Sequence, residues 1–465
     1  MTSARLREVP VGRYPLNGLR GCLTAARWDR LTAAATRWAA TLPTVWHVNS
    51  TDNGGGVAEM LRPALGYGHA LGLGLRWLVI EADTDFFTTT KRVDNGISGV
   101  PGDGGPLGPE QVEGFRRVSR EAAADLGRFL RPGDVVVLHD PQTAGLCEHV
   151  ADRGAIPVWR AHNGADRPNA HTARSSAFLT PFLRRARGLI TTRPHFRDVV
   201  LDSRMGVPSA SITPFIDPMS AKNTDLTADA ARSLLVRAGL LAAPDAGHPV
   251  VRVGTAPGAD VPMVAQVSRW DSVKDMIGVM DSFARTVAPR TDAHLSLIGP
   301  QVDGVADDPE AAEYFRLCAA HWERLPRAVR SRVQLCCLPT ADPVENARVV
   351  NAVQRHAAVI TQKSRSEGFG LTVAEAMWKG TPVVATRVGG ITAQIPDARH
   401  GRAVALPDPD DLFGGAITEL LADPATGAAV GHAARERVRD RFLPDSHLHD
   451  ELSFLGGLVG SEVAA

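Results

Sequence analysis

Short apolar runs alternate along the chain with longer segments in which apolar residues recur every three or four positions. The runs have the length of strands and the longer segments have helical periodicity, an alternation typical of parallel sheets joined by crossover helices. In the first half of the chain, we expect strands at Thr44–Asn49, Leu75–Ala82, Asp134–Asp140, Ile156–Asn163 and Gly188–Thr192. In the second half, we expect strands at Pro262–Arg269, Ala293–Pro300, Val333–Leu338, Ala357–Gln362 and Pro382–Thr386.

These strands predict two domains. A chain of 465 residues is too long for one compact core, and each half carries enough strands for a sheet of its own. The predicted fold class is α/β, with two Rossmann-like doubly wound domains facing a central cleft. The extended segment Ser211–Asn223 contains two prolines and is the expected linker. We place the N-terminal domain at residues 1–215, the C-terminal domain at 216–440, and a helical segment that packs back on the N-terminal domain at 441–465.

Composition limits the classes of partner. The 51 basic and 51 acidic residues cancel, so the chain has no net field that attracts nucleic acid or an anionic membrane surface. The N-terminus lacks the apolar core of a signal peptide, and no stretch approaches the ~18 apolar residues of a membrane span. We therefore expect a cytoplasmic protein without nucleic-acid or membrane partners, and a homodimer is left open.

The cysteines give no sign of a metal site or a disulfide framework. They are five in number, widely scattered, and lack both metal-ligand spacing and a C-x-x-C pair. We expect reduced core thiols at Cys22, Cys147, Cys318, Cys336 and Cys337.

A glycine-rich turn follows the first predicted strand. Ligands of open α/β sheets lie beyond the carboxyl ends of the strands, so polar and glycine residues at these ends carry most weight. Asn53 and the three glycines Gly54–Gly56 precede a helix that begins near Val57. Glycines let the backbone approach a ligand closely, and a helix N-terminus offers unpaired N–H groups. An ordinary flexible loop is the alternative, and the G-x-G-x-x-G fingerprint of a dinucleotide site is absent.

Two cations stand at the end of another predicted strand. Arg269 and Lys274 are five positions apart in the turn that follows Pro262–Ser268. A guanidinium can bind phosphate with two hydrogen bonds, and an ammonium acts as a point charge, so the pair suits a diphosphate. A solvated basic pair on a loop is the alternative.

The stretch Glu367–Glu375 reads EGFGLTVAE and carries a glutamate at each end. A helix that begins near Leu371 or Thr372 would direct its positive N-terminus at a ligand beside Glu367. With a sugar nucleotide as the ligand, the helix N–H groups would bind the diphosphate and Glu375 would accept hydrogen bonds from ribose. Two solvent-facing glutamates at a chance spacing are the alternative.

The pattern of Arg269 and Lys274 followed by Glu367-x7-Glu375 resembles the donor site of retaining glycosyltransferases of the GT-B fold, particularly glycosyltransferase family 4. Within that group, the chain is similar to the trehalose synthases, which join a nucleotide-activated glucose to glucose. The similar segments, in the family's order, are NSTDNGGGVAEML, DFFTTTK, LHDPQTAGL, PFIDPMSAKN, AQVSRWDSVKD, ADDPE, NAVQRHAAVITQKSRSEGFGLTVAEAMWKGTPVVA and VGGITAQI. They extend from about Val45 to about Pro407, and the long C-terminal run is the most specific.

The resemblance implies a role for each matched residue, with the acceptor side in the N-terminal domain and the donor side in the C-terminal domain. His162 matches a histidine that lines the sugar pocket, Glu367 would contact the donor sugar, and Glu375 would bind ribose. The residues implied in catalysis are Arg269, Lys274, Glu367 and His162. Those implied in donor binding are Gly55, Gly56, Arg269, Lys274, Gly368, Phe369, Gly370, Leu371, Thr372 and Glu375. Those implied in acceptor binding are Asn53, Gly54, Asp94, Asp140 and Asn163.

The implied reaction moves a hexose, glucose in the family, from a nucleotide diphosphate sugar to a small hydroxyl acceptor with retention. Fixed cations and a helix N-terminus can stabilise the departing diphosphate, so we expect neither a metal nor a cofactor beyond the donor. No D-x-D motif or histidine-rich cluster is placed to require a divalent ion. The leaving phosphate would help to deprotonate the acceptor, so no side chain is assigned as a nucleophile.

The chain departs from the trehalose-synthase pattern on the acceptor side. The segment His162–Asp166 reads HNGAD where the family is expected to have HIDLS, and Asp94 stands where it is expected to have a histidine. The loss of a carboxylate at Gly164 and of a histidine at Asp94 changes the hydrogen bonds offered to an acceptor, and unpaired buried polar groups discriminate strongly. A modified sugar, an aminocyclitol or a natural-product alcohol therefore competes with glucose as the acceptor.

Other functions remain open. A trehalose phosphorylase-like enzyme would use inorganic phosphate and need no nucleotide pocket, and a pseudo-glycosyltransferase would act on a cyclitol. A non-catalytic sugar- or nucleotide-binding protein could keep the fold but would not need both cations and both glutamates. A dehydrogenase is disfavoured because its glycine fingerprint is missing.

Overall fold

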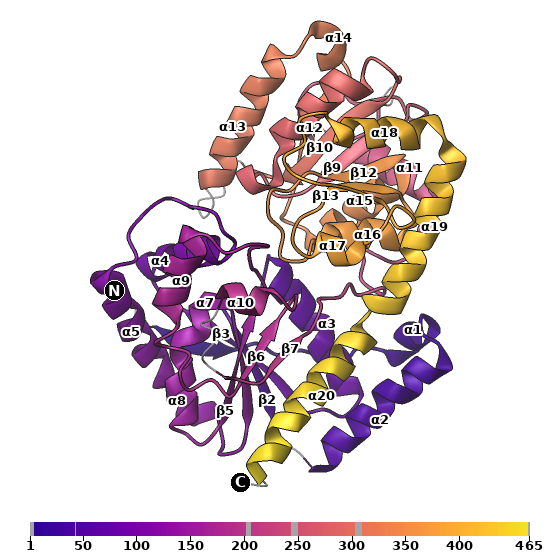
Figure 1. Cartoon of the computed structure of the whole chain (residues 1–465). Coiled ribbons are helices and arrows are strands. Elements are labelled where there is room, and N and C mark those ends of the chain that lie inside the picture. Colours follow the sequence, from indigo (N-terminus) through magenta and orange to yellow (C-terminus); the bar gives the residue numbers. More distant parts are fainter. Residues whose placement is uncertain (1–3, 42, 201–205, 243–249, 303–308, 464–465) are drawn as a thin grey trace. The chain divides into compact units, whose positions relative to one another are not determined.

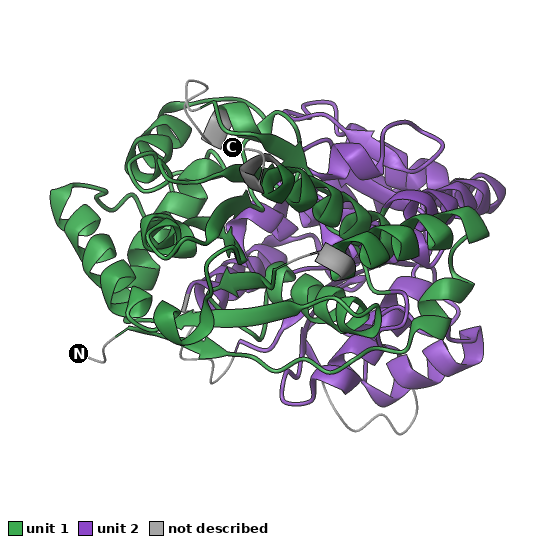
Figure 2. Cartoon of the chain, turned by 90° about the horizontal axis from the view of Figure 1, so that it is seen from below, with its two compact units in different colours: residues 1–217, 367–369, 442–465 green, residues 218–366, 370–441 purple. Residues whose placement is uncertain are grey.

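The chain forms two compact units in a computed structural model that describes residues 4–41, 43–200, 206–242, 250–302 and 309–463 (Figures 1 and 2). The first unit comprises Met1–Asp217, Glu367–Phe369 and Phe442–Ala465. The second unit comprises Pro218–Ser366 and Gly370–Arg441. The sequence placed the corresponding limits at 215 and 440, and the structure adds a short exchange of chain at 367–369.

A seven-stranded sheet forms the centre of the first unit. All its pairings are parallel except that of the edge strand β1, which runs antiparallel to β3. In order across the sheet, the strands are β1 (Arg5–Glu8), β3 (Leu75–Glu81), β2 (Val45–Asn49), β4 (Val135–His139), β5 (Ile156–Ala161), β6 (Gly188–Thr191) and β7 (Ser209–Ser211).

The second unit repeats this plan with another seven-stranded sheet. Here the antiparallel edge strand is β8, which pairs with β11. In order across the sheet, the strands are β14 (Arg402–Val404), β13 (Val383–Thr386), β12 (Val359–Gln362), β9 (Met263–Val267), β10 (His294–Pro300), β11 (Val333–Leu338) and β8 (Val251–Val253).

Helices connect the strands in both units. Those of the first unit are α1 (Leu16–Gly21), α2 (Ala25–Thr41), α3 (Gly56–Ala70), α4 (Thr84–Ile97), α5 (Pro109–Ala123), α6 (Leu126–Phe129), α7 (Asp140–Thr143), α8 (Cys147–Ala151), α9 (Ala170–Leu179), α10 (Phe196–Val200) and α20 (Pro444–Val463). Those of the second unit are α11 (Ala228–Arg237), α12 (Met276–Ser282), α13 (Pro309–Arg324), α14 (Arg327–Arg330), α15 (Pro343–His356), α16 (Leu371–Trp378), α17 (Ile391–Gln394), α18 (Leu412–Ala422) and α19 (Pro424–Arg441).

The predicted strands are all present, with ends that differ by at most two residues. The strands that the sequence did not predict, β1, β7, β8 and β14, occupy the edges of the two sheets. An edge strand is covered less than a central one, so these segments of three or four residues lack a continuous apolar run. The predicted doubly wound α/β domains are confirmed, and because β1 and β8 are antiparallel to their neighbours, both sheets are mixed.

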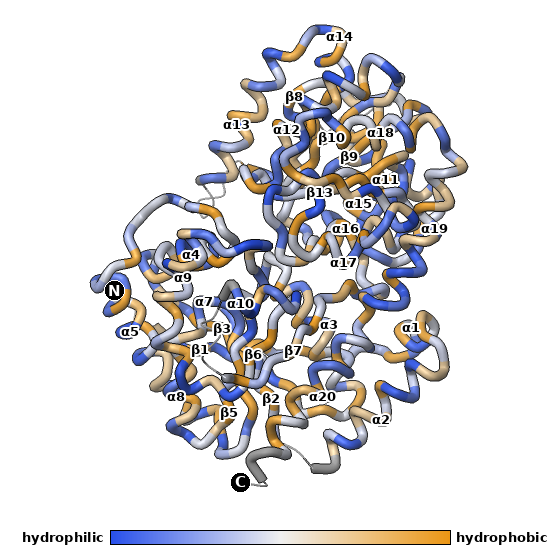
Figure 3. The backbone as a smooth tube through the Cα atoms, viewed as in Figure 1, coloured by the Kyte–Doolittle hydropathy of each residue, from blue (hydrophilic) through white to orange (hydrophobic). Residues whose placement is uncertain are grey.

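Strand β4 shows why the first sheet needs helices on both faces. Val136 and Leu138 belong to one buried cluster with residues of α5 and α8, whereas Val135 and Val137 belong to another with residues of α2 and α3. Successive side chains of a strand point to opposite faces, so a strand that is apolar throughout must be covered twice. Hydrophobic stretches recur along the strands of both sheets in Figure 3.

Helix α20 completes the second of these clusters. It lies beside α2 in Figure 1, and Leu448, Leu452, Leu455 and Leu458 are buried in the cluster that includes α2 and α3. The first unit is therefore built from both ends of the described chain.

The cysteines are all free, as expected. Four of them are buried, and Cys22 is only partly buried. Among the described residues, we find no helix that is both long enough and apolar enough to cross a membrane.

A buried ion pair fixes α20 to the first sheet. Arg160 of β5 and Glu451 of α20 approach to 3.0 Å, and their side chains are only 1% and 6% exposed. Arg160 also donates to the Ile212 carbonyl at 3.4 Å. Because both charges are removed from water, each charge needs the other as a partner that offsets its lost hydration.

Replacement of Glu451 by alanine should lower the free energy of unfolding by about 3–5 kcal/mol, because it leaves the Arg160 cation buried without its partner. Urea titration followed by circular dichroism measures this change. The double variant Arg160→Met/Glu451→Leu should recover much of the loss. Glu113→Ala, which breaks the exposed pair with Arg120, is the matched control and should cost about 1 kcal/mol or less. Equal losses in Glu451→Ala and Glu113→Ala would contradict the assignment.

Candidate active site

The loops that follow β9 and β12 lie side by side at the carboxyl edge of the second sheet. The two strands are parallel neighbours. The backbone N–H of Arg365, in the second loop, donates to the carbonyl oxygen of Val273, in the first loop, at 2.8 Å. The structure thus joins the loop of the predicted diphosphate cations to the loop that leads into the glutamate motif.

Arg269 remains reachable in its loop. Its side chain is 68% exposed and lies 3.3 Å from Asp271, an ion pair that contributes little at the surface. Asp271 also accepts from the backbone of Val273 at 2.7 Å and so fixes the turn. Lys274 is partly buried, and its carbonyl accepts from the Gln266 side chain at 2.8 Å. The loop is held by its own hydrogen bonds while its guanidinium can meet a ligand.

Helix α16 begins at Leu371, as predicted, directly after Gly370. Gly370 has a φ of +87°, a backbone conformation that residues other than glycine rarely adopt. Glycine is therefore required at this cap. The first turn, with Leu371 and Thr372, contains no acidic residue. Its N–H groups are therefore suited to an anion such as a phosphate.

Glu375 is enclosed within α16 and is only 3% exposed. Its carboxylate lies 3.4 Å from Lys222 Nζ. Lys379 Nζ donates to the Glu375 carbonyl at 3.0 Å and to Asn223 Oδ1 at 2.8 Å. The linker thus contacts the glutamate through Lys222 and the neighbouring lysine through Asn223, and the contact of Glu375 with ribose remains a prediction.

The segment Glu367–Phe369 belongs to the first unit, although its chain neighbours belong to the second. A Cβ added to Gly368 would lie 2.3 Å from Asn163 Oδ1 and 2.8 Å from the His162 carbonyl, so only glycine fits against this pair. Phe369 packs edge-on against Phe442, with ring centres 5.4 Å apart. The two glutamates of the x7 motif are therefore held by different units.

The glycine loop after β2 is open. Gly54 and Gly55 have φ of +70° and +76°, and a Cβ on either would meet no atom within 4 Å. Gly56 begins α3, and Gly55 is its cap. The Thr51 hydroxyl donates to the Asn53 carbonyl at 2.6 Å and accepts from the Asn53 N–H at 3.1 Å. The loop presents bare backbone before a helix N-terminus, as close approach to a ligand requires.

Four predicted residues meet at the carboxyl ends of β4 and β5. Asp140 Oδ1 accepts from the backbone N–H of His162 at 2.9 Å. Asn163 Nδ2 donates to both carboxylate oxygens of Asp94, at 3.1 Å and 3.3 Å. Asp140 has a φ of +60°, an uncommon conformation for a residue with a side chain and one that recurs at functional sites.

The carboxyl group of Asp140 has a raised pKa. Burial is the larger cause and the negative charge of Asp94 the smaller one, and together they raise its pKa to about 8. At neutral pH, Asp140 is therefore largely a neutral acid that can donate as well as accept. A sugar hydroxyl could use either function.

The sequence prediction missed two histidines that lie beneath His162. His139 Nδ1 is 2.8 Å from His162 Nε2, and His139 Nε2 is 3.1 Å from His47 Nδ1. His47 and His139 are each 1% exposed. A single histidine inside each of the apolar strands β2 and β4 was the available signal.

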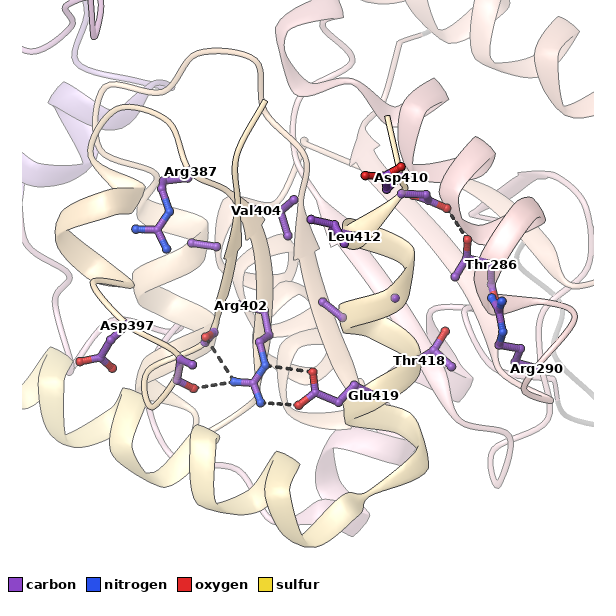
Figure 4. A pocket seen from close by; sticks show the side chains of 16 residues that line it. Thr286, Arg290, Arg387, Asp397, Arg402, Val404, Asp410, Leu412, Thr418 and Glu419 are labelled. Atoms are coloured by element: carbon purple, nitrogen blue, oxygen red, sulfur yellow. Dashed lines mark hydrogen bonds and ion pairs between the residues drawn. The ribbon is translucent and has the colours of Figure 1, made fainter. Parts of the chain in front are cut away.

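A pocket in the second unit has a volume of about 670 Å³, and none of the predicted site residues lines it (Figure 4). It lies along β14 and α18, where Arg402 NH2 binds Glu419 at 2.7 Å. Arg402 and Glu419 neutralise each other, Asp397 pairs with Arg399 and Asp411 with Arg285, so we do not place the active site there.

Metal ligation finds no support within the described ranges. There, no three or more His, Cys, Asp or Glu side chains gather in a way that could hold an ion. Independence of a metal remains a prediction.

Comparison with known proteins defines the family. Residues 47–198 match the description "Trehalose synthase, N-terminal domain", and residues 343–437 match "Glycosyl transferases group 1". The chain is 33% identical to a trehalose synthase from Pyrococcus horikoshii over 89% of this chain and 90% of that one. It is 30% identical to a trehalose synthase from Rubrobacter xylanophilus over 90% and 91%.

Solved structures agree on the fold. A trehalose 6-phosphate synthase from Burkholderia multivorans superposes with a TM-score of 0.66 at 14% identity, over 91% of this chain and 98% of that one. The fold and the matched segments define a glycosyl-transferring enzyme of the GT-B class. The chain belongs to the trehalose synthase family.

The raised pKa of Asp140 predicts a pH-dependent stability. An unfolded aspartate ionises near pH 4, so between about pH 4 and pH 8 the folded protein holds one more proton than the unfolded chain, and stability falls as pH rises. Asp140→Asn removes this slope, which is at most about 1.4 kcal/mol per pH unit. Urea titrations at pH 5 and pH 8 should show that the free energy of unfolding of the variant, relative to that of the wild type, increases between the two pH values.

Asp94→Asn should reduce the slope in part, because it removes the neighbouring negative charge but leaves Asp140 buried. If the free energy of unfolding had the same pH dependence in Asp140→Asn and in the wild type, the raised pKa of Asp140 would be contradicted.

Proposed function

We propose that the enzyme transfers a hexose, glucose in the first instance, from a nucleotide diphosphate sugar to a hydroxyl acceptor with retention of configuration. The observation that carries this proposal is the joined pair of loops after β9 and β12. They bring Arg269, Lys274 and the N-terminus of α16 to one edge of one sheet. Such a set of positive groups suits a diphosphate.

The chemistry that we propose needs no nucleophilic side chain. The bond from the sugar C1 to the leaving phosphate oxygen breaks, and a bond from C1 to the acceptor oxygen forms on the same face. The acceptor's proton passes to the departing phosphate. Arg269, Lys274 and the α16 N–H groups stabilise the charge that develops there, without a divalent metal.

The residues on the acceptor side favour an acceptor whose hydrogen bonds to the enzyme differ in part from those in the relatives. A Cβ added to Gly164 would lie 2.4 Å from Phe196, so no side chain can project from this position. The carboxylate of Asp94 is bound by Asn163. We propose that Asp94, Asn163 and the neutral acid of Asp140 select the acceptor, which leaves modified sugars and cyclitols beside glucose as candidates.

A phosphorylase is the second candidate. The chain is 27% identical to a trehalose phosphorylase from Pleurotus pulmonarius over 91% of this chain, although over only 58% of that protein. An enzyme of that kind would bind inorganic phosphate where we propose the nucleotide diphosphate.

The purified protein should release nucleoside diphosphate when a nucleotide glucose and an acceptor are both present, and NMR of the product should show the α-anomer. Glucose, modified sugars and cyclitols are tested as acceptors in parallel.

Arg269→Ala and Lys274→Ala should lower kcat by about 10²–10³-fold, the usual effect of removing one preorganised charge-stabilising group. Nucleotide-free formation of glucose 1-phosphate from trehalose and inorganic phosphate would replace this proposal with the phosphorylase.

The two glutamates of the x7 motif should differ in effect. Glu375→Gln should weaken binding of free nucleoside diphosphate by about 10–100-fold, the range of one hydrogen bond to a charged group. Glu367→Gln should leave that affinity nearly unchanged and lower kcat, because a contact with the reacting sugar acts in the transition state. Calorimetry and steady-state kinetics measure both effects. Glu345→Gln, on an exposed part of α15, is the control, and identical behaviour of the two motif variants would refute the division.

A further inference from the structure

Three histidines form a continuous row within the first unit. They come from three neighbouring strands or strand ends: His47 from β2, His139 from β4 and His162 directly after β5. The Nδ1 atom of His47 lies 3.1 Å from Nε2 of His139, and Nδ1 of His139 lies 2.8 Å from Nε2 of His162. The rings of His139 and His162 are stacked, with centres 5.1 Å apart and planes 11° apart.

The two hydrogen bonds couple the tautomers of all three rings. A neutral imidazole carries one N–H, and each ring-to-ring hydrogen bond needs one proton. The proton that remains therefore sits at one end of the row. If it is on Nε2 of His47, then His162 has its proton on Nε2 and its Nδ1 is an acceptor. If it is on Nδ1 of His162, that atom is a donor instead.

The rings are neutral under ordinary conditions. Burial lowers the pKa of His47, and it lowers the pKa of His139 and His162 well below the usual range. The positive charge of Arg160 acts in the same direction on all three. The row therefore holds three protons, as the tautomer argument requires.

The surrounding charges distinguish the two ends. The carboxylate of Glu451 acts on His47, where it favours a proton. The strongest charge acting on His162 is the cation of Arg160, which disfavours one. Arg160 and Glu451 form the buried ion pair at 3.0 Å, so this field is fixed by the fold. It draws the mobile proton toward His47.

The far nitrogen of His162 is thereby available to a ligand. Among the described residues, no hydrogen bond to Nδ1 of His162 accompanies the one that Nε2 makes with His139. The backbone of His162 is fixed on both sides, because its N–H donates to Asp140 and its carbonyl accepts from Thr192 at 2.9 Å. The ring can therefore present one defined nitrogen.

We propose that His47 and His139 are positioning residues that hold His162 in the Nε2–H tautomer, so that its Nδ1 accepts a hydrogen bond from a substrate hydroxyl. The substrate part rests on the proposed function, whereas the tautomer is a property of the free protein. A sugar whose hydroxyl is replaced by hydrogen or fluorine at the contacted position cannot donate to Nδ1 and should bind less well.

The tautomer can be measured without substrate. Protein labelled with ¹⁵N-histidine gives two-bond proton–nitrogen correlations that separate the two tautomers, and loss of a signal in His162→Gln assigns the residue. We expect the Nε2–H pattern for His162 in the wild type. In His47→Phe, which removes the end of the row, we expect a mixture of tautomers or the Nδ1–H form.

Kinetics provide the second measurement. His47→Phe should lower kcat/KM by about tenfold, the equivalent of one neutral hydrogen bond. The matched control is His447→Phe, since His447 is also buried and contacts Arg160 at 3.3 Å but lies outside the row. It should keep the His162 tautomer and leave kcat/KM nearly unchanged, because no hydrogen bond in the described part of the chain joins His447 to the row. His47→Leu, which also lacks a hydrogen-bonding side chain, replaces His47→Phe if the latter does not fold.

Two outcomes overturn the proposal: an Nδ1–H tautomer of His162 in the wild type, or an unchanged tautomer in the folded His47 variant. An Nε2–H tautomer that depends on His47, combined with no transfer from any nucleotide sugar, would reject the proposed function and leave the histidine arrangement standing.

Discussion

A parallel strand that is covered on both faces can offer polar side chains to a ligand only where it ends. This constraint governs the arrangement of the candidate site. The central strands of each sheet are largely apolar and enclosed. Asp140 and His162 come directly after β4 and β5, and Arg269 follows β9 by two residues. Polar side chains inside the strands are bonded within the protein instead: His47 and His139 hydrogen-bond along the histidine row, and Arg160 pairs with Glu451.

Sequence patterns predicted what depends on local composition. The run Thr44–Asn49 identified β2, and the glycines before Leu371 identified the start of α16. Patterns could not reveal β1 or β14, because short edge strands need no apolar run. Nor could they pair Arg160 with Glu451, which stands 291 positions later, since nothing local to either residue names its partner.

Membership of a family and identity of the substrate rest on different parts of the chain. The overall similarity to trehalose synthases extends along about nine-tenths of the sequence. The acceptor contacts depend on a few side chains, and Phe196 fills the space that any side chain at position 164 would occupy. The similarity along the chain thus defines the family, whereas the choice of acceptor by these few positions is our proposal.

The course of the chain through its units also bears on biosynthesis. The first unit begins the described chain but needs α20, whose leucines cover the faces of α2 and α3. The ribosome makes the whole second unit before it reaches Pro444. At a rate of about 5–20 residues per second, the nascent first unit waits on the order of ten seconds or more before α20 can cover the apolar surfaces of α2 and α3. During that interval, the growing chain has a binding surface for a chaperone that the finished protein no longer exposes.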